Sequence, residues 1–554
     1  MNNSDKNPLG IDPETKENIA RALWMSEYNP GLIPPEIMEK INDTKNSNPA
    51  FGNRMKGRLD DLLHNPESFT PDYTERYEIF LDYSGEMSPH QAYSMTNLLG
   101  QDSVRGYREL TSNFILKIPE CDRPQLLYQV GWHFFVGTAF DANNKEYGVQ
   151  MMFWHYSLLP PEMAKEAGLS DEENQIVEMH LAISVANERH YRSRPVIAAG
   201  TTGLIRFSDS PYSYEFGKNK ITSKAKDAIF PIRLEAWSID NREETPVEIA
   251  IDITLNQTKG YVLNGDKGMS PSCGGIGTLY YSVPNLQVGP TGSWLSIGGE
   301  KIQLTGGKFW YDHQWGTGFM PQGSTRPEPL RAFVLTQNQK SVPGWDWMEI
   351  QFDDDTEIAL SALHTIDNLK FYFQTGPNPP GTMTADAKGS YIRKNGEYSP
   401  IDATIQVTEW VKSVVSDGPY MATDTWYPNR VEVTVNTKDV PGISAEKRNF
   451  VMVPIVLTGQ QGFFGSGAQY SEGAVDIESP GGKKIGVGFL ESVNYADSTK
   501  QILRLAGLPD NDDMVRLVTS SVVPEILRIE AQAFLEIPGN RRKLEEELMN
   551  CKGT

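Results

Sequence analysis

The chain has 554 residues, of which 39% are hydrophobic and 22% charged, a composition typical of globular proteins. Its 72 acidic and 51 basic residues give a formal net charge of -21, which argues against a protein that binds nucleic acid or an anionic membrane surface. No apolar run approaches the ~20 residues of a transmembrane helix, and no signal peptide is visible. The cysteines (Cys121, Cys273 and Cys551) form no CxxC pair, so we expect a cytoplasmic protein with reduced thiols.

The first 120 residues show helical periodicity. Asp12 and Pro13 fit the N-cap and first turn of a helix that carries Ile19, Leu23 and Trp24 at helical spacing. We predict a helical N-terminal extension over residues 1–120. It has no catalytic signature, and we expect it to act as a scaffold or as a contact in a homo-oligomer.

From residue 121 to 495 the hydrophobic period is two, with clear alternation at 147–153, 247–255 and 431–435. The regular alternation of strands with helices that an α/β fold needs is missing. This pattern predicts a mainly β protein built as an antiparallel sandwich or barrel. The segment 320–330, rich in Pro and Gly, divides the region into two halves.

We therefore predict a first β domain over residues 121–325 and a second over residues 326–495. From 496 to 554 the pattern is helical again. Leu527, Phe534 and Leu535 form an apolar face there. It could lie on a membrane surface, but its acidic flanks favour packing on the core or on a partner helix.

The chain lacks a P-loop, a GxSxG nucleophile elbow and an HExxH zinc helix. Because no two histidines have i, i+4 spacing, we expect neither a metal site nor a cofactor. The acidic run 353–355 lies between two alternating segments. It predicts a hairpin turn, and it would bind calcium only if other oxygen atoms converged on it.

The segment GGKFWYDHQWGTGF, residues 306–319, concentrates aromatic and polar side chains. In an extended strand they alternate between two faces, with Trp310, Asp312 and Gln314 on one and Tyr311, His313 and Trp315 on the other. Aromatic surface beside Asp312 should raise the pKa of its carboxyl, which could then donate a proton near neutral pH. The rings could stabilise a carbocation. The alternative is a structural aromatic corner in which backbone amides satisfy Asp312.

Several motifs, in order, resemble the lipocalin-like family of carotenoid 1,2-hydratase, kievitone hydratase and AttH-type proteins, an architecture that some fungal Diels–Alderases share. The resemblance covers residues 125–495. It rests on VGWHFFVGTAFDANNKEYGVQMMFW (130–154), MHLAISVANERHY (179–191), the glycine-rich segment 258–292, GGKFWYDHQWGTGF, GWDWMEIQFDDDTEIAL (344–360) and YSEGAVDIESPGGKKIGVGFLESVNY (470–495). One departure is that Val130 and Gly131 precede Trp132, where the family usually has an acidic residue.

The resemblance implies two consecutive lipocalin-like β-barrels or sandwiches with a ligand cavity near their junction. It also implies that Asp312 protonates an alkene, with His313 and Tyr311 as further catalytic candidates. The substrate-binding candidates are Trp310, Trp132, His155, His180, Tyr281, Trp315, Trp345, Trp347 and Glu472.

These expectations favour a cofactor-independent hydratase or dehydratase that acts on an alkene or tertiary alcohol of a small apolar, isoprenoid-like substrate. One alternative is a pericyclase or isomerase in the same pocket, where Asp312 would only hydrogen-bond to a carbonyl. The other is a non-catalytic carrier of hydrophobic ligands.

Overall fold

The computed structural model describes residues 107–108, 110, 114–317, 341–365, 377–413, 425–463 and 469–495, apart from gaps of one to four residues within these ranges. The sequence predicts helical extensions at 1–120 and 496–554. Residues 1–106, residues 496–554 and the proposed boundary at 325/326 lie outside the described residues, and the described residues between 107 and 119 form no helix. Strands dominate the described part, so the expectation of a mainly β protein is confirmed.

The strands between residues 130 and 317 form one antiparallel sheet, called here the first sheet. Its strands are β1 (Val130–Asp141), β2 (Glu146–Ser157), β3 (Gln175–Val185), β4 (Arg189–Arg192), β5 (Val196–Ala199), β6 (Ile205–Asp209), β7 (Tyr212–Phe216), β8 (Asn219–Ser223), β9 (Ile232–Asp240), β10 (Val247–Asn256), β11 (Val262–Leu263), β12 (Met269–Cys273), β13 (Ile276–Val288), β14 (Trp294–Ile297) and β15 (Glu300–Thr317). The main strand order is β4-β3-β2-β1-β15-β13-β10-β9-β8-β7-β6.

The strands between residues 341 and 493 form a second antiparallel sheet. They are β16 (Ser341–Phe352), β17 (Glu357–Thr365), β18 (Met383–Ile392), β19 (Tyr398–Lys412), β20 (Trp426–Val435), β21 (Asn449–Pro454), β22 (Gln461–Phe463), β23 (Gln469–Glu478) and β24 (Lys484–Val493). The order is β21-β20-β19-β18-β17-β16-β24-β23-β22, and β21 also pairs with β23. That extra pairing closes eight of the strands into a barrel, called here the barrel.

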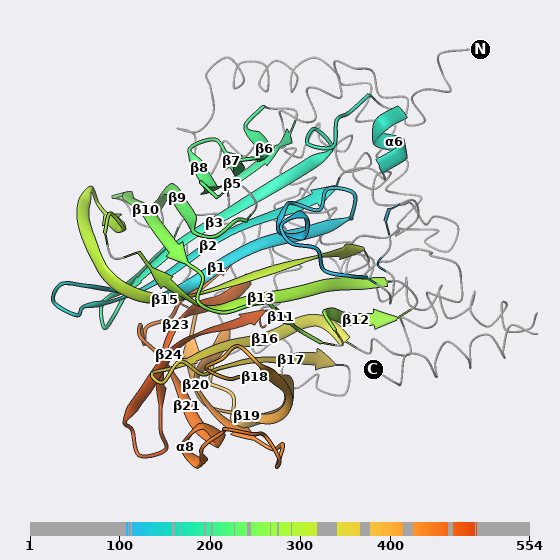
Figure 1. Ribbon diagram of the computed structural model, residues 1–554. Coiled ribbons are helices and arrows are strands. Elements are labelled where there is room, and N and C mark those ends of the chain that lie inside the picture. Colours follow the sequence, from blue (N-terminus) through green and yellow to red (C-terminus); the bar gives the residue numbers. More distant parts are fainter. Residues whose placement is uncertain are drawn as a thin grey trace, which may run out of the picture.

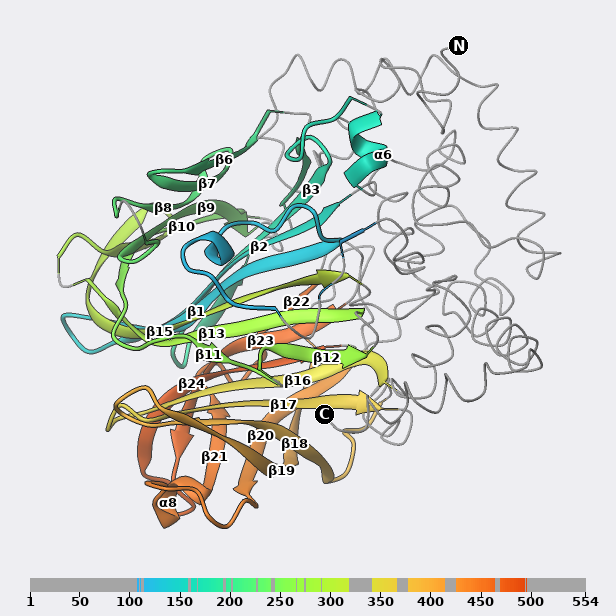
Figure 2. The same cartoon turned by 45° about the vertical axis from the view of Figure 1, so that its right-hand side comes forward.

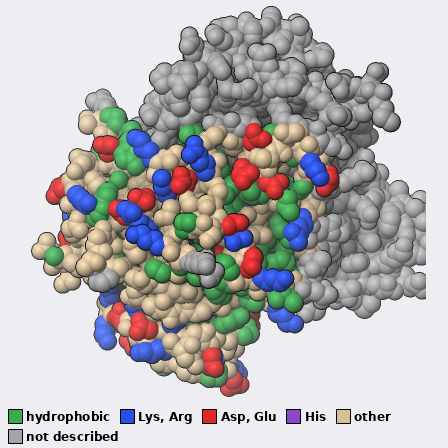
Figure 3. All heavy atoms as spheres, turned by 45° about the horizontal axis from the view of Figure 1, so that its top comes forward, with side chains coloured by type: hydrophobic (Ala, Val, Ile, Leu, Met, Phe, Trp, Pro, Cys, Tyr) green, Lys and Arg blue, Asp and Glu red, His purple; other side chains and the backbone are tan. Residues whose placement is uncertain are grey.

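Three short helical elements accompany the described strands: η4 (Glu120–Asp122), α6 (Pro161–Glu166) and α8 (Ala445–Arg448). η4 precedes β1 along the chain. α8 leads directly into β21 (Figure 1). Across the described part of the face in Figure 3, basic and acidic side chains are interspersed.

The first sheet is strongly curved, so that β3 and β4 come close to β9 and β10. An ion pair joins β4 to β9, with 3.6 Å between Arg189 Nη2 and Asp240 Oδ2. The backbone N–H of Arg192 donates to the same oxygen atom at 3.3 Å. The curvature encloses an apolar core that side chains from most strands of this sheet share. The barrel encloses a separate core.

The two sheets meet along one surface, called here the junction. On one side lie β1, β2, β13 and β15, and on the other β16, β23 and β24 (Figures 1 and 2). Strands β1 and β2 and the last half of β15 are buried on both faces, whereas β10 alternates between buried and half-exposed positions. The difference arises because β10 packs on one core only, while the junction strands lie between the core of the first sheet and the barrel.

The local predictions tested by the described strands are confirmed. The alternating run 247–255 forms β10, and the runs 147–153 and 431–435 fall within β2 and β20. The acidic run 353–355 is the turn of the β16–β17 hairpin. Lysine ammonium groups bind its carboxylates, with Lys308 Nζ 3.0 Å from Asp355 Oδ1 and Lys447 bound to Asp354.

Candidate active site

Strand β15 carries the predicted site residues on two opposite faces. Tyr311 and Trp315 belong to the core of the first sheet, and the His313 ring lies 4.7 Å from that of Trp315. Trp310 and Asp312 lie on the other face, where the Trp310 ring is edge-on to Trp347 of β16. The structure therefore brings Asp312 to the junction and leaves Tyr311 and His313 on the core side of the sheet.

Asp312 accepts hydrogen bonds from three side chains of the first sheet. Tyr280 Oη donates to Oδ2 at 2.7 Å, and Trp310 Nε1 donates to Oδ1 at 2.7 Å. Ser282, its partner across the β13–β15 ladder, also donates to Oδ1. From the barrel, Trp347 Nε1 donates to Tyr280 Oη at 2.7 Å. Residues of both sheets thus hold the carboxyl in one orientation.

The carboxyl of Asp312 has little contact with water, because the residue is 3% exposed. Burial raises the pKa of Asp312 to about 7, while the hydrogen bonds from Ser282, Tyr280 and Trp310 act in the opposite direction by stabilising the charged form. Near neutral pH both the acid and the carboxylate are populated. A group in that state can give up a proton and take it back, as general acid catalysis requires.

Aromatic rings line the junction around Asp312. Trp347 lies edge-on to Phe134, with 5.7 Å between ring centroids, and to Trp310, with 6.4 Å. Phe134 is the ladder partner of Asp312 on β1, so both side chains share the junction face. Trp132, two residues earlier on that face, stacks on Trp154 at 4.4 Å. Such rings suit an apolar ligand and can stabilise positive charge.

The barrel contributes further buried carboxyls to the junction. Glu472 and Glu491 are ladder partners on β23 and β24, and Trp347 pairs with Glu491 from β16. Burial raises the pKa of Glu491 to about 7 and that of Glu472 well above its ordinary value. Gln150 Nε2 donates to Glu472 Oε2 at 2.6 Å, and Trp345 Nε1 donates to Glu491 Oε2 at 3.1 Å.

His180 of β3 also reaches across the junction. Its Nδ1 lies 2.7 Å from Tyr470 Oη of β23, and its Nε2 lies 2.5 Å from Glu178 Oε1. Six of the predicted substrate-binding residues lie at or beside the junction: Trp132, Trp310, His180, Trp345, Trp347 and Glu472.

The remaining candidates gather on the core side of the first sheet. Tyr281 and Tyr261 donate to the carboxyl of Asp122 in η4, and burial raises the pKa of Asp122 to about 6. The His313 ring lies 4.0 Å from that of His133, and Tyr311 lies near both rings. This is a second polar cluster, separated from Asp312 by the thickness of the sheet.

His155 belongs to the core side as well. A Cβ atom on Gly131 would come within 2.6 Å of the His155 ring and 3.0 Å of Trp315 Cβ. Glycine stands at this position because the two side chains occupy the space of its missing side chain. The departure from the family pattern before Trp132 therefore coincides with a close packing contact.

Sequence reasoning missed four polar residues of the junction: Tyr280, Ser282, Glu349 and Glu491. Alternation within LYYSV and DWMEIQF places Tyr280, Ser282 and Glu349 on the faces of Asp312 and Trp347, which was the available signal, whereas Glu491 lies outside both segments. Within the described ranges, no three His, Cys, Asp or Glu side chains are grouped so that they could hold a metal ion. The same ranges contain no helix long and apolar enough to span a membrane.

A family model described as AttH-like matches residues 109–495. The solved structures similar to this chain include two crystal structures. One, assigned to AttH of Nitrosomonas europaea, has 17% identity and a TM-score of 0.49, and the match covers 70% of this chain and 100% of that one. The other, kievitone hydratase of Nectria haematococca, has 14% identity and a TM-score of 0.43, with 71% and 98% covered. No curated protein matches the chain.

Proposed function

The chain belongs to the AttH-like family, and from the geometry around Asp312 we propose that it is a cofactor-independent hydratase or dehydratase. The substrate would carry an alkene or a tertiary alcohol. The observation that supports this most directly is a carboxyl that is buried, has its pKa raised to about 7 by that burial, and is surrounded by indole and phenyl rings.

In the hydration direction, the Asp312 carboxyl gives its proton to one alkene carbon. The new C–H bond leaves a carbocation on the neighbouring carbon, and Asp312 becomes a carboxylate. Tyr280, Ser282 and Trp310 already donate to this carboxylate, so its charge is stabilised as it forms. Water then adds to the cation and loses a proton. Dehydration follows the same steps in reverse.

The aromatic rings around Asp312 favour a hydrophobic substrate. The rings of Phe134, Trp310 and Trp347 lie close to Asp312 and to one another. A branched alkene gives a tertiary cation, the most accessible carbocation for a carboxylic acid to generate, and branched alkenes recur along isoprenoid chains. We therefore propose an isoprenoid or prenylated substrate.

Solvent labelling tests this proposal. The protein is incubated in D₂O with a panel of isoprenoid trisubstituted alkenes and tertiary alcohols, and products are analysed by mass spectrometry and NMR. Hydration should place one deuterium on carbon next to the new C–O bond. Asp312→Asn should abolish turnover, whereas Asp122→Asn, which changes a buried acid on the core side, should retain it.

Other outcomes would point to the alternatives. Conversion to a cyclised or rearranged product without deuterium on carbon would favour the pericyclase or isomerase. Tight binding of panel members without any conversion would favour the carrier. Full turnover by a folded Asp312→Asn variant would contradict the proposed role of Asp312.

A further inference from the structure

The outer face of β16 carries a buried carboxyl that no described residue satisfies. Glu349 is 0% exposed, and neither of its carboxyl oxygens has a hydrogen-bond partner in the described part of the chain. The same is true of both amide atoms of Gln351, two residues further along this face. Buried polar groups nearly always bond to protein, water or ligand. The space next to Glu349 and Gln351 is therefore suited to water or to a polar group of a ligand.

Alternation along β16 fixes where Glu349 points. Its neighbours Met348 and Ile350 belong to the barrel core, so Glu349 and Trp347 face the first sheet. Two contacts place β16 against β15. Trp347 binds Tyr280, which in turn binds Asp312, whereas Lys308 Nζ donates to Phe352 O at 2.9 Å.

These two contacts show that β15 and β16 run antiparallel to each other across the junction. Moving from Lys308 to Asp312 on β15 corresponds to moving from Phe352 to Trp347 on β16. Glu349 lies between those ends and therefore faces the stretch around Trp310. The Trp310 indole is bonded to Asp312. Glu349 is thus placed on the barrel wall of the junction, next to the Asp312 site on the opposite wall.

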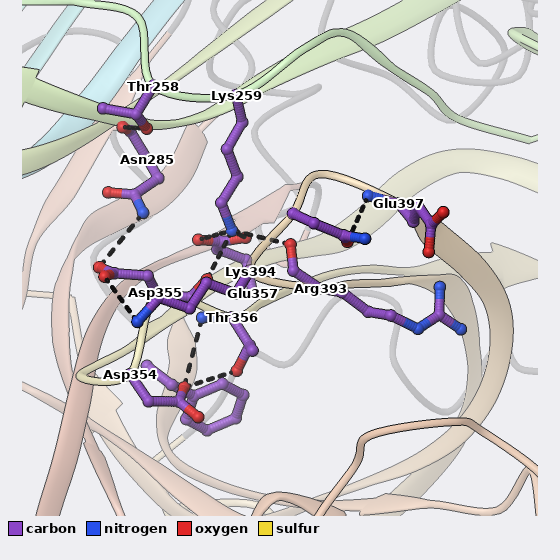
Figure 4. Close-up of polar contacts among 12 residues, drawn as sticks. Thr258, Lys259, Asn285, Asp354, Asp355, Thr356, Glu357, Arg393, Lys394 and Glu397 are labelled. Atoms are coloured by element: carbon purple, nitrogen blue, oxygen red, sulfur yellow. Dashed lines mark hydrogen bonds and ion pairs between the residues drawn. The ribbon is translucent and has the colours of Figure 1, made fainter.

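Among the described residues, no basic side chain hydrogen-bonds to Glu349. Lys308, whose charge acts on Glu349, bonds to Phe352 and to Asp355 in the acidic turn. Lys259 is bonded to Glu357 and to the backbone oxygens of Asp355 and Arg393 (Figure 4). Burial therefore raises the pKa of Glu349 well above its ordinary value. The Gln351 amide acts in the opposite direction and is the next largest effect, followed by Asp312 and Glu357, which raise this pKa, and by Lys308, which lowers it.

We propose that Glu349 is a second catalytic acid of this site, which exchanges protons with Asp312 and with the adding water. The inference rests on the proposed function. Glu472 and Glu491 are weaker candidates, because Gln150 and Trp345 already donate to them. Glu349 has its two oxygens available for a water molecule or for the substrate hydroxyl.

The proton balance of the cycle is as follows. Both carboxyls begin protonated. Asp312 transfers its proton to the alkene carbon, and water forms a C–O bond to the resulting cation. Glu349 passes its proton through a water molecule to the Asp312 carboxylate. The Glu349 carboxylate then accepts the proton released by the bound water, so that both acids are restored and the substrate has gained one water.

The first experiment needs no substrate. Infrared difference spectra between wild type and Glu349→Gln, recorded as a function of pH, should show the carbonyl stretch of one protonated carboxylic acid, shifted in D₂O, which persists above the ordinary titration range of a glutamate. In Asp312→Asn, this band should titrate at a lower pH, because a nearby negative charge has been removed. The control Asp122→Asn should leave the Glu349 band and its titration unchanged. A Glu349 that titrates in the ordinary range of a glutamate, or that does not respond to Asp312→Asn, would overturn the inference.

The second experiment follows turnover of an alkene from the D₂O panel. Glu349→Gln should form about one product per protein molecule quickly, using the proton already on Asp312. Its steady-state rate should then fall by about 10²-fold, in the range of general acid–base catalysis, with little change in KM. Glu349→Asp should recover part of the rate. If Asp312→Asn is inactive while Glu349→Gln keeps the full rate, only the Glu349 inference fails. If Asp312→Asn and Glu349→Gln are both folded and keep the full rate, the Glu349 inference and the proposed function both fail.

Discussion

Lys259, in the segment after β10, forms a buried ion pair with Glu357 of β17. Its Nζ lies 2.6 Å from Glu357 Oε2, and the two side chains are 4% and 0% exposed. The same ammonium donates to the backbone oxygen of Arg393 at 3.0 Å (Figure 4). The pair thus joins the first sheet to the barrel at one end of the junction.

Lys259→Met should destabilise the protein, because it leaves the Glu357 carboxyl buried without its cation. Breaking a buried ion pair by removing one partner costs about 3–5 kcal/mol. The loss should be largest above pH 7 and smaller at pH 5, since burial raises the pKa of Glu357 to about 7 and the protonated acid needs no cation. Urea denaturation at both pH values measures it. Lys394→Met, whose side chain is 74% exposed, should cost less than about 1 kcal/mol.

Asp312→Asn should be more stable than wild type at alkaline pH. The pKa of Asp312 is raised from 3.8 to about 7 on folding, so the folded state holds this proton more tightly than the unfolded state. The stability from this group is fully present below pH 3.8 and is lost as the pH rises to about 7, at about 1.4 kcal/mol per pH unit. Asparagine does not ionise. Thermal or urea unfolding measures the stability of Asp312→Asn relative to wild type. If this difference did not grow in favour of the variant between pH 4 and 7, the raised pKa of Asp312 would be contradicted.

Hydration activity should fall as the pH rises above about 7, because only protonated Asp312 can give up a proton. The measurement is kcat/KM against pH for one alkene of the panel. Asp122→Asn should leave the alkaline limb where it is, although burial raises the pKa of Asp122 to about 6. Activity that rises steadily to pH 9 would show that Asp312 acts as a base or not at all.

Trp347→Phe should move that alkaline limb to higher pH. The indole N–H that donates to Tyr280 is lost, so Tyr280 becomes a weaker donor to Asp312. A less stabilised carboxylate has a higher pKa. Trp345→Phe removes a donor from Glu491 instead and should not move the limb. If Trp347→Phe and Trp345→Phe shifted the alkaline limb equally, the cause would be a general loss of packing.

Gly148→Ala tests how closely the two sheets must approach. A Cβ atom on Gly148 of β2 would lie 2.5 Å from Ala474 Cβ of β23, so the sheets would have to separate. Overpacking of this kind costs about 1–3 kcal/mol, and turnover should fall along with stability. Gly306→Ala is the control, because nothing lies within 4 Å of its added Cβ. A fully stable and active Gly148→Ala protein would show that the junction tolerates separation.

The sequence predicted the strands and the alternation within them but not the contacts between sheets. β10 and β20 each pack on one core only, so apolar and polar residues alternate clearly in their sequences. The same alternation in β15 places Asp312 and Trp310 on one face. The family resemblance, which pointed to AttH-type proteins, is confirmed by the match over residues 109–495. Whether Asp312 is the acid stays a prediction.

The sequence does not show which strands of the first sheet face which strands of the barrel. The contact that reaches Asp312 from across the junction depends on how the barrel docks on the first sheet: Trp347 of β16 donates to Tyr280 of β13, 67 residues away in the chain. Local periodicity contains no information on such a contact. The position of Asp122 beside Tyr281 is equally non-local, because η4 and β13 lie far apart in sequence.

Strands β13 and β15 are buried on both faces where they lie at the junction, and this affects how the sequences of family members can change. Tyr280 donates a hydrogen bond to Asp312, whereas the next residue, Tyr281, donates one to Asp122 on the other side of the sheet. On the proposed function, substitutions at the positions that face the junction would alter the chemistry, and those at the positions between them would alter the core. The substrate range could then change through every second residue of a strand while the residues between them keep the fold intact.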